Sequence, residues 1–226
     1  MSLLDYRIGP VLALLDSDIT ATLPSSIAAA TGMDALTHAI EAYTGKLSNP
    51  ISDGLALLAI RLISCNLKAA VQEPDNLDAR EKMLVASLIA GMAFGNSDIA
   101  GVHCISEAIG GMYDTPHGVG NAIFLPFMFN HNRDADRRRH ADVAYALGMS
   151  PNLSEAAAAE AAVAHLFKMN RDLKIPRFAE IDGVREEDFP AIAQKAKNNI
   201  SDASNARDMT VESYLEVIRE AYDYDV

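Results

Sequence analysis

From residue 25 to the end of the chain, apolar residues recur at steps of three and four, and alternating β-branched runs are few. Steps of three and four place apolar side chains on one face of an α-helix, whereas a half-buried strand needs a step of two. We therefore expect an all-α fold, a bundle-like domain of several helices with at most one short N-terminal strand, at residues 10–16. Half of the 226 residues are hydrophobic and no linker or repeat interrupts them, so we expect one domain over residues 1–226.

Capping residues and prolines set the expected helix boundaries. Asn49 followed by Pro50 is a typical helix start, because proline is tolerated in the first turn. Pro116 cannot lie inside a helix and disfavours helical angles in the residue before it, so His117 should open the next helix. The expected helices are 25–43 with an adjustment near Gly32, 50–70, 78–95, about 101–112, one from His117, 153–170, one from about 186, and 211–222.

Charge and hydropathy argue against two classes of partner. The formal net charge is -12, and Arg137–Arg139 is the single basic cluster, which we interpret as a solvated helix face, so we expect no nucleic acid partner. Arg61 interrupts the best apolar stretch, residues 55–63, well short of the ~18 to 20 residues that a membrane helix needs. We expect a soluble protein without a secretory signal.

The two cysteines, Cys65 and Cys104, lie far apart and form no CxxC motif. A disulfide framework is therefore not indicated, and a reducing cytoplasm is the expected location. We interpret Cys104 as a small buried hydrophobic residue.

Four residues form a candidate site for a divalent transition metal. Asp34 and His38 are four apart, so a helix places both on one face, with about 5 to 6 Å between their Cβ atoms. Alone, such a pair is more often a surface ion pair. His103 and His117 add two imidazoles, and they can converge if the chain turns back between them. A site with one carboxylate and three imidazoles suits Fe²⁺, Zn²⁺ or Mn²⁺. Spacing alone leaves the metal site and the surface pair both open and names no reaction.

The remaining histidines lack ligand spacing. We expect surface or helix-end positions for His131, His140 and His165.

Several segments, in order and with matching gaps, resemble the helical C-terminal half of the iron-containing (group III) alcohol dehydrogenases, whose fold is like the C-terminal domain of dehydroquinate synthase. The segments are Ala28–Tyr43, Gly91–Asn96, Gly101–His103 and Tyr113–Ala122, with an approach at 16–24 and a closing segment at 202–222.

The resemblance implies that Asp34, His38, His103 and His117 bind the metal, Fe²⁺ with Zn²⁺ or Mn²⁺ as alternatives. Phe94 matches an aromatic position of the family's substrate pocket, although an ordinary core role is equally compatible with the sequence. Glu107 stands where the family often has a histidine near the nicotinamide, which affects the expected substrate preference and rate. Residues 205–207 lack a proline that family members usually carry there.

The implied activity is hydride transfer between a primary or secondary alcohol, or its aldehyde, and NAD or NADP. The glycine-rich nucleotide-binding domain of the family has no counterpart in this sequence, and residues 10–16 would mark where it attaches. We therefore expect the chain alone to bind metal but to be weakly active or inactive. An apolar face left without that domain would favour a homo-oligomer.

Two alternatives remain. One is a non-catalytic metal-binding or assembly module that retains the helical fold. The other is a relative that reduces an unsaturated oxoacid without metal, which the four intact ligand residues disfavour.

Overall fold

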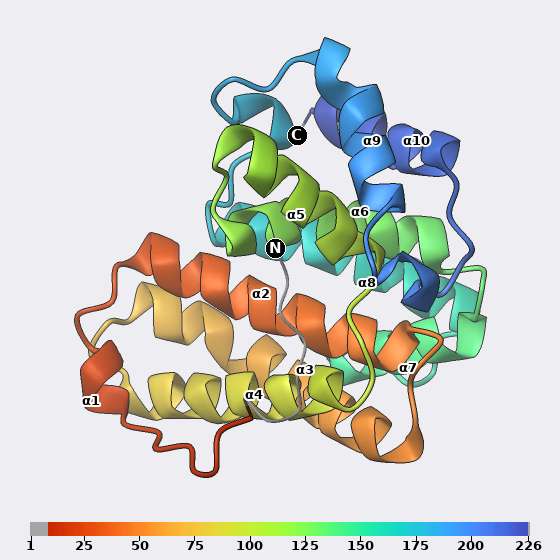
Figure 1. The fold of residues 1–226 in the computed structure, drawn as a ribbon. Coiled ribbons are helices and arrows are strands. Elements are labelled where there is room, and N and C mark those ends of the chain that lie inside the picture. The colour runs from red at the N-terminus through yellow and green to blue at the C-terminus, as the bar shows by residue number, and fades with distance from the viewer. Residues whose placement is uncertain (1–8, 226) are drawn as a thin grey trace.

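A computed structural model describes residues 9–225, and within them the chain forms ten α-helices, three short 3-10 helices and no strand (Figure 1). The all-α expectation is confirmed. The α-helices are α1 (Ser17–Thr20), α2 (Ser25–Thr44), α3 (Pro50–Gln72), α4 (Leu77–Gly95), α5 (Gly101–Tyr113), α6 (His117–Asn132), α7 (Arg137–Ala146), α8 (Glu155–Asp172), α9 (Phe189–Lys197) and α10 (Val211–Asp223), and the 3-10 helices are η2 (Phe178–Glu180), η3 (Glu186–Asp188) and η4 (Asp202–Ser204).

The helix ends follow the local signals in the sequence. The Asn49 side chain accepts hydrogen bonds from the backbone N–H groups of Ile51 and Ser52, and the Ser52 hydroxyl accepts one from the Asn49 N–H. This reciprocal cap satisfies donors that the first helical turn leaves unpaired. Helix α6 begins at His117 directly after Pro116, as expected.

The expected strand at residues 10–16 is wrong. In the described part of the chain, residues 12–16 have no regular structure, and Asp16 caps α1 by accepting a hydrogen bond from the Asp18 N–H at 3.0 Å. A single strand cannot satisfy its backbone groups without a partner, and this chain offers none between residues 9 and 225.

The cluster Arg137–Arg139 is only partly solvated, which corrects the sequence interpretation. Arg137 is exposed and pairs with Asp134 at 2.9 Å. Arg139 instead lies over the Tyr43 ring, 4.0 Å from its centroid, donates to the Tyr43 carbonyl at 2.8 Å and pairs with Asp53. Its guanidinium therefore joins α7 to the end of α2 and to α3.

The helices form two groups that meet at α2. Helices α2, α3 and α4 pack against one another in the lower part of Figure 1, and α5, α6, α9 and α10 lie above them. Helix α2 contacts α6 as well as α3, α4 and α7. The junction of α2 with α5 and α6 is where the candidate ligands lie.

Gly32 marks the close contact of α2 with α3. A Cβ atom at Gly32 would lie 2.2 Å from Cδ1 of Leu67, so any larger residue would displace the leucine. Helix α2 runs through Gly32 without a break, so the expected adjustment there is one of packing rather than of backbone geometry.

Helix α3 is long and apolar enough to cross a membrane by length and composition, with a mean hydropathy of 1.6 over its most apolar stretch, 39% of which is buried. The expectation that Arg61 leaves this segment too short and too polar to span a membrane is therefore wrong by length and composition. Core helices meet the same criterion, and α3 packs against α2, α4 and α7.

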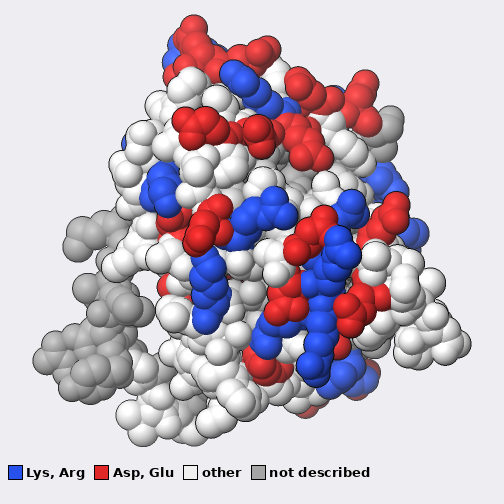
Figure 2. Space-filling view, turned by 90° about the vertical axis from the view of Figure 1, so that its right-hand side faces the viewer, with Lys and Arg blue, Asp and Glu red and all other residues white. Residues whose placement is uncertain are grey.

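On the face drawn in Figure 2, basic side chains alternate with acidic ones. Ion pairs such as Lys68 with Asp172, 3.0 Å apart, and Lys168 with the same carboxylate, 2.6 Å apart, neutralise charge locally.

Candidate metal centre

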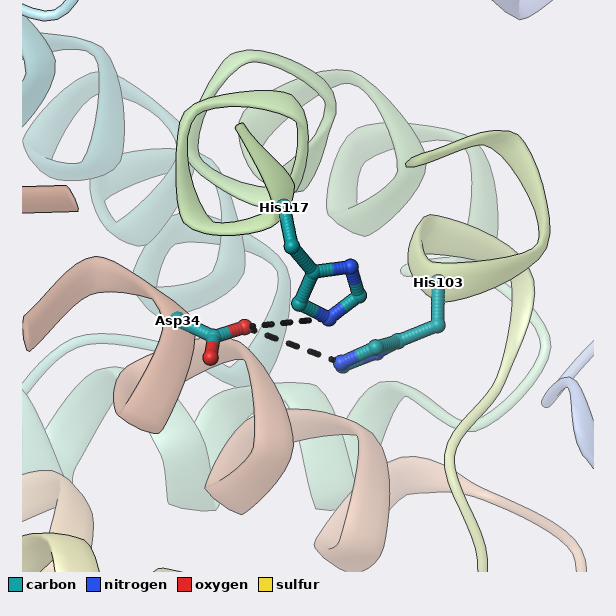
Figure 3. A group of neighbouring side chains, drawn as sticks. All are labelled: Asp34, His103 and His117. Carbon is teal, nitrogen blue, oxygen red and sulfur yellow. Dashed lines mark ion pairs between the residues drawn. The ribbon is translucent and has the colours of Figure 1, made fainter. Parts of the chain in front are cut away.

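Three ligand-type atoms converge where α2, α5 and α6 meet. Oδ1 of Asp34 lies 3.5 Å from Nε2 of His117 and 3.8 Å from Nε2 of His103 (Figure 3). The three side chains point at one another from three different helices, and their ligand atoms all lie within 4.8 Å of one another. Atoms so spaced could share one ion at the usual distances of about 2.0 to 2.2 Å.

His38 lies beside this group, one helical turn after Asp34. Its ring centroid is 4.3 Å from that of His103, and its Nδ1 lies 2.9 Å from the Asp34 carbonyl oxygen. With Nδ1–H donating to that carbonyl, Nε2 keeps a free lone pair. Of the four predicted ligands, the structure thus brings three into one tight group and places the fourth in contact with it.

Glu41 fixes the orientation of His103. One Glu41 carboxylate oxygen lies 2.6 Å from Nδ1 of His103, and the two oxygens also accept hydrogen bonds from the backbone N–H groups of Ala100 and Val102 at 2.8 and 2.7 Å. The His103 Nδ1–H therefore donates to Glu41, and Nε2 faces the site with its lone pair. Carboxylate partners of this kind commonly orient metal-binding histidines.

Gly118 lets His117 reach the site. A Cβ atom at Gly118 would lie 2.5 Å from the Ala30 carbonyl oxygen, so only glycine allows the first turn of α6 to approach α2 this closely. The Ser106 hydroxyl donates to the His117 carbonyl at 3.1 Å, which ties the same turn to α5.

Asn121 lies behind the three ligand atoms and is fully buried. Its Nδ2 is 2.5 Å from Oδ1 of Asp34, 3.0 Å from Nε2 of His103 and 3.1 Å from Nε2 of His117. Its Oδ1 is buried without a hydrogen-bond partner among residues 9–225. One amide nitrogen thus faces every atom of the group.

The donor set fits a divalent ion. Burial, with the neighbouring His103, lowers the pKa of His38 to about 4, so this imidazole is neutral at pH 7 and keeps a lone pair. Three acceptor atoms converge, yet an amide NH₂ has only two protons to give them. A cation would satisfy all of them at once, and imidazole nitrogens with one carboxylate suit Fe²⁺, Zn²⁺ or Mn²⁺.

Access to the group is from the His117 side. The side chains of His117, Asp34 and His103 are 46%, 24% and 1% exposed. The Phe94 ring packs against His38, with 4.4 Å between ring centroids. Glu107, one turn after His103, accepts a hydrogen bond from the Asn199 side chain at 2.9 Å.

The other histidines lie outside the group, as expected. His140 lies in the first turn of α7, which agrees with the expected helix-end position, but it is buried and not at the surface. His140 is 1% exposed, packs on Phe129, and its Nδ1 lies 2.8 Å from the Asp136 carbonyl at the start of α7. The two cysteines are free, Cys65 exposed and Cys104 buried.

Glu41 and Asn121 are the site residues that the sequence analysis did not single out. Both lie in the segments that carried the resemblance, seven residues after Asp34 and four after His117. The spacing of Asn121 from His117 is the one local signal available, since residues four apart share a helix face. Nothing local links Glu41 to His103, 62 positions away.

Comparison with known proteins places this geometry in a family. The model of the Fe-containing alcohol dehydrogenase family, C-terminal, matches residues 28–222. The chain is 41% identical over 221 residues to the 1,3-propanediol dehydrogenase of Klebsiella pneumoniae and 39% identical over 223 residues to the NAD-dependent methanol dehydrogenase of Bacillus methanolicus. These alignments cover 97% and 98% of this chain but 57% and 58% of those relatives.

Solved structures agree with the sequence comparison. A 1,3-propanediol oxidoreductase superposes with a TM-score of 0.89 at 42% identity, over 91% of this chain and 54% of that one. An iron-containing alcohol dehydrogenase from Thermococcus thioreducens superposes with a TM-score of 0.88 at 29% identity, over 99% of this chain and 57% of that one. The chain spans little more than half the length of its relatives, and it belongs to the iron-containing alcohol dehydrogenase family, whose C-terminal part it matches.

Proposed function

We propose that this chain is the metal-binding catalytic part of an alcohol dehydrogenase that interconverts a small alcohol and its aldehyde with NAD or NADP. The observation that carries the proposal is the convergence of Asp34, His103 and His117 on one point, with His38 in contact. We assign all four side chains as ligands of a divalent ion. Fe²⁺ is the first candidate because of the family, and Zn²⁺ and Mn²⁺ suit the same donors.

When bound, such an ion supplies Lewis-acid polarisation of a substrate oxygen. The protein's own contribution is orientation. Glu41 fixes the ring of His103, the Asp34 carbonyl fixes the ring of His38, and the half-exposed His117 leaves the approach to the site open. Phe94, packed on His38, offers an apolar wall for the carbon chain of the substrate.

For the substrate we propose a short-chain alcohol or its aldehyde. Relatives named for 1,3-propanediol, methanol and lactaldehyde, all small and polar, support this choice, whereas one relative, 39% identical over 193 residues, is named for long-chain alcohols. For the coenzyme we propose NAD, since one of these relatives is named NAD-dependent. Glu107, held by Asn199, introduces a carboxylate one turn after His103, and we propose that it influences which of these substrates is preferred.

The test separates metal binding from catalysis. The chain is reconstituted anaerobically with Fe²⁺ or Zn²⁺, freed of excess ion, and assayed for metal content, for NADH binding by fluorescence and for NAD⁺ reduction with 1,3-propanediol. Bound metal together with NADH binding supports the proposal, and NAD⁺ reduction is expected to be weak or absent in this chain alone, which spans little more than half the length of its relatives. Bound metal without any nicotinamide response would favour the alternative, a non-catalytic metal-binding or assembly module, and absence of metal would contradict both.

A further inference from the structure

We propose that Asn121 is a positioning residue whose side-chain amide bridges the three converging ligand atoms in the metal-free protein and holds the Asp34 carboxylate in place when an ion is bound. The proposal rests on the proposed function, because it concerns the same metal centre. It assigns a role to a residue that lies in the interior of α6, one turn after His117.

Asn121 contacts all three ligand atoms. Nδ2 of Asn121 is within 2.5 to 3.1 Å of Oδ1 of Asp34, Nε2 of His103 and Nε2 of His117. These atoms come from α2, α5 and α6, so the amide is a common partner of all three helices. No backbone group is needed for the contact, and the side chain itself is fully buried.

The three ligand atoms are also electrostatically alike. When both Nε2 atoms are unprotonated, as metal binding requires, their lone pairs and the Asp34 carboxylate oxygen repel one another unless something positive lies beside them. The Nδ2 protons carry partial positive charge, and two of them are available for three acceptors. The amide thus reduces the repulsion among the three ligand atoms before an ion binds. Because it has two protons for three acceptor atoms, one of these atoms remains without a hydrogen bond from it.

The Asn121 amide directs its nitrogen, and not its oxygen, at the three ligand atoms. Oδ1 of Asn121 is buried and has no hydrogen-bond partner in the described part of the chain. A buried acceptor without a partner costs free energy, so the orientation persists only because the reverse one is worse. Rotating the amide by half a turn would direct Oδ1 at the Asp34 carboxylate and at the Nε2 atoms of the two histidines. An acceptor would then face three other acceptors.

From these contacts we expect the Asn121 amide to keep the Asp34 carboxylate in position when the ligands bind an ion. A carboxylate oxygen can accept this hydrogen bond and still offer another lone pair. Without the amide, Asp34 would be free to turn away from the two histidines, because its side chain is 24% exposed.

Asn170 provides a matched control. Its Nδ2 donates to the Ala122 carbonyl on α6 at 2.6 Å, and its Oδ1 is likewise buried without a partner among residues 9–225. It supports the same helix next to Asn121. A substitution there tests the effect of losing a buried amide on α6 without removing the contact to the ligand atoms.

The experiment compares the whole chain with its Asn121→Ala and Asn170→Ala variants. Zn²⁺ affinity is measured by competition with a chelator, the visible absorption spectrum is recorded with Co²⁺, and the metal-free proteins are melted. We expect Asn121→Ala to weaken Zn²⁺ binding by about 10- to 100-fold and to change the Co²⁺ spectrum. Asn170→Ala should lower the melting temperature yet leave both metal readouts unchanged.

The outcomes are distinct. Wild-type affinity and spectrum in Asn121→Ala would overturn the proposal, and so would equal losses in the two variants, which would mean general destabilisation of α6. If the parent chain itself binds neither Zn²⁺ nor Co²⁺, the proposed metal centre fails and this proposal falls with it.

Discussion

Nδ1 of His103 lies 2.6 Å from a carboxylate oxygen of Glu41, and the two side chains are 1% and 5% exposed. The same carboxylate accepts the backbone N–H groups of Ala100 and Val102 at the start of α5. One buried side chain of α2 therefore caps α5 and orients the imidazole that α5 contributes to the site. A carboxylate is suited to this role because all three partners are donors.

Glu41→Gln should weaken both metal binding and folding. A glutamine keeps one acceptor oxygen but turns its NH₂ toward an N–H donor, so a buried donor loses its partner, at a cost of about 1 to 3 kcal/mol. Loss of the hydrogen bond between His103 and the Glu41 carboxylate should lower Zn²⁺ affinity by about 10- to 100-fold. Chelator competition and urea unfolding measure the two effects. Glu81→Gln, at an exposed position of α4, is the control and should change neither.

Gly118→Ala should displace His117. The added Cβ would lie 2.5 Å from the Ala30 carbonyl oxygen, so α6 must move away from α2. We expect a lower melting temperature together with substoichiometric metal. Gly54→Ala in α3 is the matched control, because a Cβ there meets nothing within 4 Å. Gly54→Ala should stabilise the chain by about 0.5 to 1 kcal/mol. A Gly118→Ala protein that is as stable as the parent and binds a full equivalent of metal would contradict the close packing of α6 on α2.

Acidification should destabilise the metal-free protein between about pH 6.5 and 4. Burial lowers the pKa of His38 to about 4 and lowers the pKa of His140 below its ordinary value of 6.5. In that range the unfolded chain binds protons that the folded chain does not, so stability falls as the pH falls. Each such histidine contributes at most about 1.4 kcal/mol per pH unit. Carboxylates with lowered pKa values, such as Asp172, reduce the stability of the folded chain only at still lower pH, where the unfolded chain begins to protonate them.

His140→Gln tests this directly. Glutamine cannot titrate, so the variant should lose less stability than the parent chain between pH 7 and 5, even though its stability at pH 7 is lower. Urea unfolding at several pH values measures both quantities. Parallel pH profiles for the two proteins would show that His140 contributes nothing to the dependence.

The cysteines should differ in reactivity. Cys65 is exposed, whereas Cys104 is buried, and burial raises the pKa of the Cys104 thiol above its ordinary value. Because the thiolate is the reactive form, a thiol reagent should modify Cys65 quickly and Cys104 only after unfolding. The expected result is one fast-reacting thiol in the native protein and two in denaturant, and two fast thiols under native conditions would contradict the burial of Cys104.

The parts of the fold that the sequence predicted are those set by neighbouring residues. Helix periodicity, the Asn49 cap and the stop at Pro116 act within a few positions, and the structure agrees with each. The spacing of Asp34 and His38 is local in the same sense. The convergence of His103 and His117 on Asp34 depended on the turn between α5 and α6, which Pro116 permits but does not by itself direct toward α2.

The features that the sequence did not predict depend on distant partners. Arg139 belongs to a basic run that suggests a solvated face, yet its guanidinium contacts Tyr43 and Asp53, which lie 96 and 86 positions away and cover part of it. Asn121 meets Asp34 across 87 positions. Residues 10–16 failed as a strand for the opposite reason, since strand structure needs a distant partner and the described chain supplies none.

The proposed metal centre assigns Asp34, His38, His103 and His117 as ligands of one divalent ion. The most direct measurement is the metal content of the chain after anaerobic reconstitution with Fe²⁺ and removal of excess ion, alongside His103→Ala and the control His165→Ala, whose histidine lies outside the group. We predict about one ion per chain in the parent and in His165→Ala, and little in His103→Ala. Metal-free parent protein, or equal loading of all three, would contradict the account.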